Sequence, residues 1–142
     1  AERARDEFDA QVVSPEEIHR VEAEVYAPCA LGACLTVQTV PQIGASIIAG
    51  AANNQLGDPR VGDLIRTRGL LYAPDYVINA GGVINISYEK KGYSLEKALR
   101  HAEQIGATLI EIFHRAEREQ RSTAEIADQM ALLLLSREPG PN

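Results

Sequence analysis

The sequence predicts an α/β domain in which a partial Rossmann-like, mostly parallel sheet is flanked by helices, with long helices at the C-terminal end. Three short apolar runs, within residues 24–27, 45–50 and 70–79, alternate with helix-forming segments. The run at 45–50, which is bounded by glycines, is typical of a strand buried on both faces. Short buried strands separated by helices favour a parallel sheet.

Composition limits the class of protein. The 142 residues are 45% apolar and 24% charged, which suits one globular domain. Fourteen Lys and Arg against twenty Asp and Glu give a net charge of −6. We therefore expect no nucleic-acid partner, because basic residues supply most of the affinity for phosphates. We expect no membrane partner either, since no run approaches the ~18 apolar residues of a spanning helix.

Cysteine and histidine usage indicates neither a metal site nor a redox motif. Cys29 and Cys34 are the only cysteines, and their spacing fits neither a zinc site nor Cys-x-x-Cys. The three histidines are scattered along the chain, and we expect them on the surface or partly packed. Two free thiols point to a reducing compartment, so we expect a cytoplasmic protein.

The first half of the chain contains two expected strands. Residues 1–8 read as a helix already under way, and residues 11–13 as a short extended segment. Ser14, Pro15 and Glu17 combine a capping hydroxyl, a proline at the first helical position and a glutamate that reaches back, which predicts a helix start. A strand over residues 24–27 ends at Pro28, a short helix follows over 36–42, and residues 45–50 form a buried strand.

The second half is mainly helical. Turn chemistry at residues 57–59 precedes a helix that Gly69 ends, and residues 70–79 contain a third buried strand. Ser94 caps a long helix, and Ser122 opens a second with its capping box. We expect residues 136–142 to be a frayed tail. The apolar stripe of the long helix consists of Leu95, Ala98, Leu99, Ala102, Ile105, Leu109, Ile112, Phe113 and Ala116.

Small residues and amides follow each predicted strand, in segments 28–33, 50–55 and 79–85. Ligands of open parallel sheets bind beyond the carboxyl ends of the strands. Two interpretations are open from these residues alone. The segments form a ligand site, or their glycines serve turns and helix packing while their asparagines cap helices.

The same three segments resemble the cofactor domain of the leucine, valine and phenylalanine dehydrogenases, in the glutamate/leucine/phenylalanine/valine dehydrogenase superfamily. The matching strings are APCALGA at 27–33, IAGAANNQL at 48–56 and YAPDYVINAGGVIN at 72–85. Their order and spacing match over nearly the whole chain. The resemblance implies that residues 1–135 are the C-terminal portion of a dinucleotide-binding Rossmann domain, including its C-terminal helices.

The resemblance implies NAD-dependent oxidative deamination, in which an L-amino acid loses hydride to the nicotinamide and water releases the 2-oxo acid and ammonia. It also implies a small amino-acid substrate and a homo-oligomer. The residues it places near the cofactor are Cys29, Ala30, Leu31, Gly32, Asn53, Asn54 and Asn79, and Asn54 also lies near the polar end of the substrate. Amides suit this place because they both donate and accept hydrogen bonds.

Substrate choice is carried by Val83 and Ile86, which match positions that line the pocket for the substrate side chain. Glutamate dehydrogenases of the superfamily place a hydroxyl residue at the position of Ile86, where it meets the distal carboxylate. Isoleucine offers that carboxylate no hydrogen bond, and an unpartnered buried carboxylate is costly. We therefore expect an apolar amino acid such as leucine, valine or phenylalanine.

Several family features are not found in the sequence: the glycine-rich pyrophosphate loop, the acidic ribose-binding residue, the catalytic lysine pair and the catalytic aspartate. We assign no catalytic role to Lys90, Lys91, Lys97 or Asp75. We expect the chain to be the C-terminal part of a longer dehydrogenase and to be inactive alone.

Two alternatives are a remnant that acts as a non-catalytic binding or interaction module, and an unrelated small nucleotide-binding protein. An open sheet edge and uncovered apolar faces also predict that the isolated fragment associates with itself.

Overall fold

The computed structural model describes residues 2–89 and 92–136. Lys90, Lys91 and most of the expected tail, residues 137–142, lie outside the described residues.

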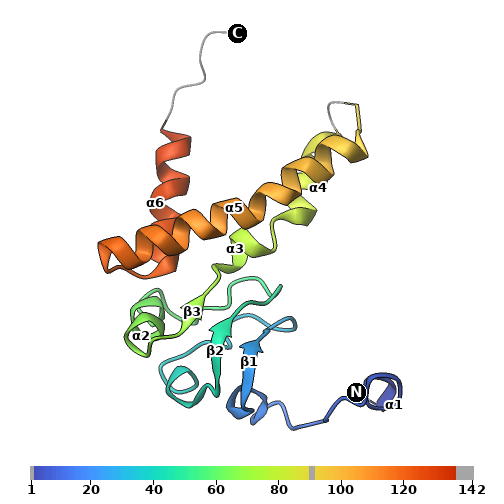
Figure 1. Ribbon diagram of the computed structural model, residues 1–142, viewed down its shortest axis with the longest axis vertical. Helices are drawn as coiled ribbons and strands as arrows, with labels where there is room; N and C mark the ends of the chain where they lie inside the picture. Colours follow the sequence, from blue (N-terminus) through green and yellow to red (C-terminus); the bar gives the residue numbers. More distant parts are fainter. Residues whose placement is uncertain (1, 90–91, 137–142) are drawn as a thin grey trace.

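Three parallel strands form one sheet in the order β1-β2-β3, as Figure 1 shows. They are β1 (Ala23–Tyr26), β2 (Ala45–Ile48) and β3 (Leu71–Tyr72). Helices of the second half of the chain lie above the sheet and beside β3 (Figure 1). The expected α/β class with a parallel sheet is therefore confirmed.

The third strand is much shorter than the apolar run that predicts it. β3 ends at Tyr72, and Pro74 starts the short helix α3 (Asp75–Ile78) inside the expected strand. Proline fixes φ near the helical value and has no N–H to lose, so it suits a helix start. The strand expected within residues 70–79 is therefore confirmed, but it covers only Leu71 and Tyr72.

Two expected helices are single 3₁₀ turns, η1 (Ile18–Arg20) and η2 (Val40–Gln42), and residues 11–13 form no strand. Before η2, the Thr36 hydroxyl accepts the N–H groups of Gln38 and Thr39 at 3.2 and 3.1 Å. Such side-chain bonds satisfy the backbone locally and compete with an α-helix. Few residues separate Ser14 from β1, so a helix here would have only about one turn. A single isolated turn of α-helix is unfavourable, because its hydrogen bond does not offset the entropy lost in nucleation.

The main core lies between the sheet and α2 (Val61–Thr67), which buries Val61 and Ile65 one turn apart on one face. Gly69 ends the α2 segment with a φ of 71°, as its sequence predicts. The buried members of this core are Leu35, Val40, Ile43, Ala45, Ile48, Val61, Ile65 and Tyr72.

The C-terminal part consists of α4 (Gly81–Glu89), α5 (Leu95–Glu119) and α6 (Thr123–Leu135). In Figure 1, α5 crosses above the sheet with α4 beside one end and α6 beside the other. Both predicted caps are confirmed: Ser94 Oγ accepts Lys97 N–H at 3.4 Å, and Ser122 Oγ accepts Glu125 N–H at 3.3 Å. A second core between α5 and α6 consists of Ile112, Ala116, Ile126 and Ala127.

Part of the apolar stripe of α5 has no cover. Leu95 and Leu99 are 57% and 55% exposed, whereas Ile112 and Ala116 are buried. Helix α1 (Glu2–Phe8) forms as expected, but it buries no residue and lies apart from the sheet (Figure 1).

Candidate functional site

The segments that follow β1 and β2 lie side by side at the carboxyl edge of the sheet. Ala52 N–H donates to Pro28 O at 2.9 Å, and Ala33 N–H donates to Asn54 O at 2.7 Å. A Cβ on Gly50 would lie 2.2 Å from Pro28 O, so only glycine permits this approach. The structure thus joins two of the three segments that the sequence singles out.

The predicted cofactor residues of the first segment face the open side of this edge. Cys29, Ala30, Leu31 and Gly32 are all exposed, and Leu31 keeps 81% of its surface. The Cys29 thiol accepts the Ala51 N–H at 3.4 Å, which links it to the second segment. The result is an exposed surface of small and apolar groups on which a flat ring can lie.

Asn79, at the C-terminal end of α3, brings the third segment to the same place. Its side-chain amide donates to Asn53 Oδ1 at 2.6 Å and to Ala51 O at 3.3 Å. Asn54 has a φ of 53°, in the left-handed region that asparagine tolerates better than most residues. Asn53 and Asn79 therefore form one hydrogen-bonded pair, while Asn54 lines a neighbouring cavity.

Gln55 and Asp75, to which the sequence analysis gives no role, hold this edge together. Gln55 is fully buried, and its side-chain amide donates to Gly50 O at 2.8 Å and to Ala52 O at 2.9 Å. The nearly buried Asp75 carboxylate accepts the N–H groups of Gln55 at 3.0 Å and of Tyr76 at 2.9 Å. A signal for Asp75 was present in the Pro-Asp pair, which is typical of a helix start.

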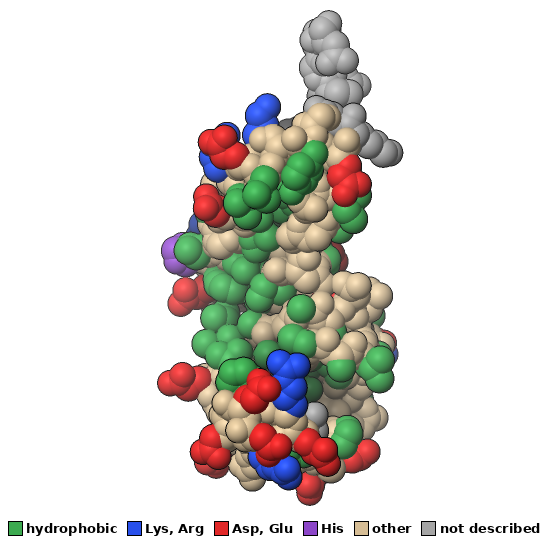
Figure 2. Space-filling model, turned by 90° about the vertical axis from the view of Figure 1, so that its right-hand side faces the viewer, with side chains coloured by type: hydrophobic (Ala, Val, Ile, Leu, Met, Phe, Trp, Pro, Cys, Tyr) green, Lys and Arg blue, Asp and Glu red, His purple; other side chains and the backbone are tan. Residues whose placement is uncertain are grey.

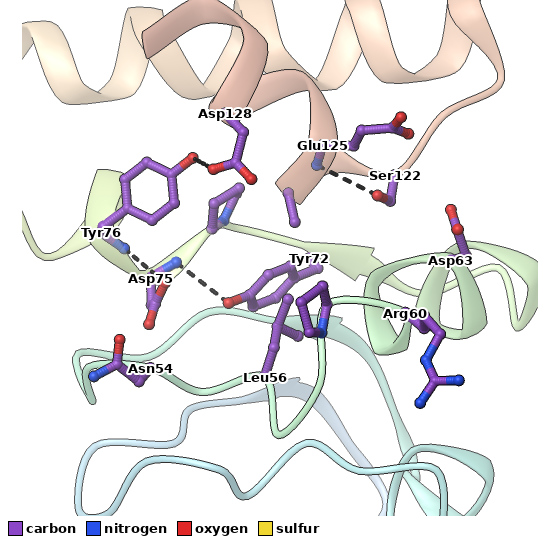
Figure 3. Close-up of a pocket in the computed structure, with 13 residues that line it drawn as sticks. Asn54, Leu56, Arg60, Asp63, Tyr72, Asp75, Tyr76, Ser122, Glu125 and Asp128 are labelled. Atoms are coloured by element: carbon purple, nitrogen blue, oxygen red, sulfur yellow. Dashed lines mark hydrogen bonds between the residues drawn. The ribbon is translucent and has the colours of Figure 1, made fainter. Parts of the chain in front are cut away.

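A cavity of about 440 Å³ opens between the end of β3, α3, the first turn of α6 and the segment after Asn54. Figure 3 shows the Tyr76 phenol pointing to Asp128 of α6, with Asn54 on the opposite side. The residues that line the cavity are Asn54, Leu56, Pro59, Arg60, Asp63, Tyr72, Pro74, Asp75, Tyr76, Ser122, Ala124, Glu125 and Asp128.

The charged side chains that line the cavity are mainly acidic. Burial, followed by the hydrogen bond to Asp128 at 2.7 Å, raises the pKa of the Tyr76 phenol. Burial and the nearby Asp75 charge raise the pKa of Tyr72. Both phenols therefore stay protonated at neutral pH. Arg60 bonds to Asp58 at 2.8 Å and holds the pKa of that carboxyl at about 2.

Val83 and Ile86 lie elsewhere, on α4. They are 74% and 62% exposed, and neither lines the cavity beside Asn54. Three residues apart on one helix, they share a face. The part of the chain that the structure describes does not enclose them in a pocket.

Residues 2–89 and 92–136 contain no group of three or more His, Cys, Asp or Glu side chains that could hold a metal ion. His19 is buried rather than on the surface or partly packed as expected, whereas the exposed positions of His101 and His114 agree with that expectation. Cys29 and Cys34 are both free thiols. No helix in the described part combines the length and apolar character needed to cross a membrane.

A family model described as Glutamate/Leucine/Phenylalanine/Valine dehydrogenase matches residues 2–134. The chain belongs to this dehydrogenase family. The resemblance carried by the three strand-end segments is thereby confirmed, and the interpretation as an unrelated nucleotide-binding protein is wrong.

The relatives of this dehydrogenase-family chain are named for different amino acids. It is 49% identical over 130 residues to a leucine dehydrogenase of Bacillus cereus, covering 92% of this chain and 36% of the relative. It is 44% identical over 121 residues to a valine dehydrogenase of Streptomyces albus, covering 84% of this chain and 33% of the relative. The chain thus spans about a third of the length of these curated relatives.

Solved structures support the same fold for this dehydrogenase-family chain. The L-tryptophan dehydrogenase of Nostoc punctiforme superposes with a TM-score of 0.88 at 45% identity, covering 92% of this chain and 39% of that one. A hetero-hexameric glutamate dehydrogenase of Thermus thermophilus superposes with a TM-score of 0.64 over 98% of this chain and 37% of that one. At 21% identity the latter likeness concerns the fold alone.

Proposed function

We propose that residues 1–135 are the C-terminal portion of the NAD-binding domain of a longer L-amino-acid dehydrogenase that oxidatively deaminates an apolar amino acid. The observation that carries this proposal is the meeting of the segments after β1, β2 and β3 at one sheet edge, in a chain 49% identical to a leucine dehydrogenase.

The residues at this edge fit a dinucleotide. The exposed surface of Cys29, Ala30 and Gly32 offers small groups and backbone against which a planar ring can lie. Asn53 and Asn54 present amides at its border, and an amide can pair with a carboxamide through both its donor and its acceptor. Bound NAD would supply the hydride acceptor, and the residues of this chain would bind and orient it.

The proposal of an apolar substrate is supported by the surface of α4 and by the relatives. Val83 and Ile86 form an exposed apolar face that has no hydrogen-bonding group to offer a distal carboxylate. The relatives named above are leucine, valine and tryptophan dehydrogenases. The amino acids in these names have apolar or aromatic side chains. The groups that abstract protons, and the rest of the side-chain pocket, would come from other parts of a longer chain that forms homo-oligomers.

The test starts from the intact mass of the protein purified from its native source. A mass well above 15.4 kDa is expected, followed by NADH formation with leucine, valine, phenylalanine and tryptophan. NADP and glutamate serve as the comparison cofactor and substrate. Glutamate activity above that of all four apolar substrates would contradict the apolar preference.

A mass of 15.4 kDa without turnover would instead favour a non-catalytic binding module. Binding of NAD to that chain then separates a module that kept the cofactor edge from one that lost it.

A further inference from the structure

The loop formed by residues 50–55 carries both exposed asparagines of the cofactor edge. It leaves β2 after Ile48 and turns back at Asn54, whose φ is 53°. Its inner side is braced by Gln55, which donates to two carbonyl groups of the same loop. Such a brace gives the loop a shape, but it does not attach the loop to the rest of the domain.

The segment after β1 holds one side of the loop, through Ala52 N–H to Pro28 O and Ala33 N–H to Asn54 O, and helix α3 holds the other side at two points. At the N-terminal end of α3, Asp75 Oδ2 accepts the Gln55 N–H at 3.0 Å while its Oδ1 accepts the Tyr76 N–H at 2.9 Å. At the C-terminal end, the Asn79 amide donates to Asn53 Oδ1 and Ala51 O. The five residues from Asp75 to Asn79 therefore span the loop from Ala51 to Gln55.

The helix is itself fixed to the body of the domain. Tyr72 Oη accepts the Asp75 N–H at 3.3 Å, and the Tyr76 phenol donates to Asp128 of α6 at 2.7 Å. Asp75 is only 8% exposed, and the hydrogen bonds of a buried carboxylate to backbone N–H groups are charge-assisted and strong. Asp75 thus connects a rigid support to the peptide group that directly follows Asn54.

We propose that Asp75 is a positioning residue for the cofactor, which fixes the 50–55 loop so that Asn53 and Asn54 face the nicotinamide. The proposal rests on the proposed function, because it is the NAD edge that the loop would serve. Asp75 itself acts through Gln55 and touches neither cofactor nor substrate.

The test compares Asp75→Asn with wild type in the protein at its natural length. Asparagine keeps the size of the side chain, but it keeps one acceptor oxygen and turns an amide N–H group toward the other backbone donor. Loss of one charge-assisted bond predicts a KM for NAD about tenfold higher. Asp75→Ala, which loses both bonds, is expected to raise it further. A merely structural role would lower the active fraction, and hence the apparent kcat, without moving this KM.

Asp63→Asn is the matched control. Asp63 is an exposed carboxylate of α2 that lines the same cavity, and its side chain bonds to no residue in ranges 2–89 and 92–136. The control removes the same charge without touching the loop, so an unchanged KM for NAD is expected. Deuterium uptake of a peptide covering residues 50–56 should rise in Asp75→Asn and not in Asp63→Asn.

The outcomes separate the two proposals. An active wild type whose KM for NAD is unchanged in Asp75→Asn would overturn the positioning role and leave the proposed function standing. A wild type that neither binds nor reduces NAD would overturn both. Should Asp75→Asn not fold, Asp75→Glu, which keeps the carboxylate but shifts it by one methylene, is measured in its place with the same rise expected.

Discussion

Gly50 lies where the backbone after β2 passes closest to Pro28. A Cβ there would lie 2.2 Å from Pro28 O and 2.5 Å from Pro28 N, both backbone atoms that cannot move without displacing the edge. We expect Gly50→Ala to lower the free energy of unfolding by roughly 1–3 kcal/mol. The measurement is the midpoint of chemical denaturation.

Gly106→Ala is the control for that substitution. Gly106 lies inside α5 and has no atom within 4 Å of its Cβ position among the residues described. Alanine in a helix interior should stabilise the protein by roughly 0.5–1 kcal/mol. Two Gly→Ala changes of opposite sign would establish the close approach, whereas equal effects would contradict it.

A substitution at Ile86 tests the proposed preference for an apolar substrate. Ile86→Thr supplies a hydroxyl to a distal carboxylate, so the ratio of glutamate to leucine kcat/KM should rise about tenfold. Ile86→Val has nearly the same shape without the hydroxyl and should leave the ratio near that of wild type. Equal ratios in the Thr and Val variants would show that this position does not meet the end of the substrate side chain.

At the residue scale, the sequence indicates which positions are exposed at the edge but not what holds them. The asparagines stand out in the sequence because amides after a buried strand suggest ligand binding. The roles of Gln55 and Asp75 depend on contacts across 20 positions, Gln55 N–H to Asp75 Oδ2, which no local pattern encodes. The Pro74-Asp75 pair is typical of a helix start. Tyr76, Val77 and Ile78, which follow it, favour a strand by propensity.

At the element scale, helix α3 is hydrogen-bonded to α6 through the Tyr76 phenol, whose ionisation is unfavourable. Burial and Asp128 raise the pKa of Tyr76 above its ordinary value of 10.0. The folded state therefore holds a proton that the unfolded chain releases above about pH 10, so stability is complete below that pH and falls as the pH rises further.

The expected result is a free energy of unfolding that decreases from about pH 10 upward, with tyrosinate absorbance appearing together with unfolding. Tyr76→Phe removes this proton and should reduce the pH dependence, to which the raised pKa of Tyr72 still contributes. The substitution also costs the bond to Asp128 at neutral pH. Tyr93→Phe, at an exposed position, is the control. A Tyr76→Phe protein as alkali-sensitive as wild type would exclude Tyr76 as the cause.

Helix boundaries were most predictable where one side chain decides them. Ser94 and Ser122 cap α5 and α6 as expected, because a hydroxyl bonded to an N–H three residues on is a local arrangement. The segment that became η1 carries similar signals, yet it is too short to add further turns. At η2, the hydrogen bonds of the Thr36 hydroxyl to the backbone compete with an α-helix.

At the scale of the whole molecule, the sequence pattern of α5 predicts which face of the helix is apolar. It does not predict which part of that face other elements bury. The stripe is buried near α6 and at the small Ala98, whereas Leu95 and Leu99 are exposed. Val83 and Ile86 are also exposed on α4, which packs against α5. Figure 2 shows hydrophobic side chains gathered over the middle and upper parts of one face. The strand β1 also forms a sheet edge with exposed residues.

The exposed end of α6 adds a further apolar surface, and together these surfaces predict the behaviour of the 142-residue chain on its own. Leu132, Leu133, Leu134 and Leu135 are between 57% and 82% exposed, which is unusual for four successive leucines of a monomer. We expect the isolated chain to sediment faster than a 15.4 kDa monomer, increasingly so at higher concentration. The double substitution Leu132→Lys and Leu135→Lys should shift the chain toward the monomer, because burying those charges in a contact is costly.

Lysine in place of Glu103 and Glu117, two exposed positions of α5, changes the net charge in the same direction without touching the leucines. Self-association should persist in that control if the apolar contact drives it. Net charge alone would instead strengthen self-association in both double variants, because both bring the net charge of −6 closer to zero. A wild-type chain that sediments as a monomer at every concentration would show that these apolar surfaces do not bind one another in water. They would then need a differently shaped partner surface, such as the one that a longer dehydrogenase chain would supply.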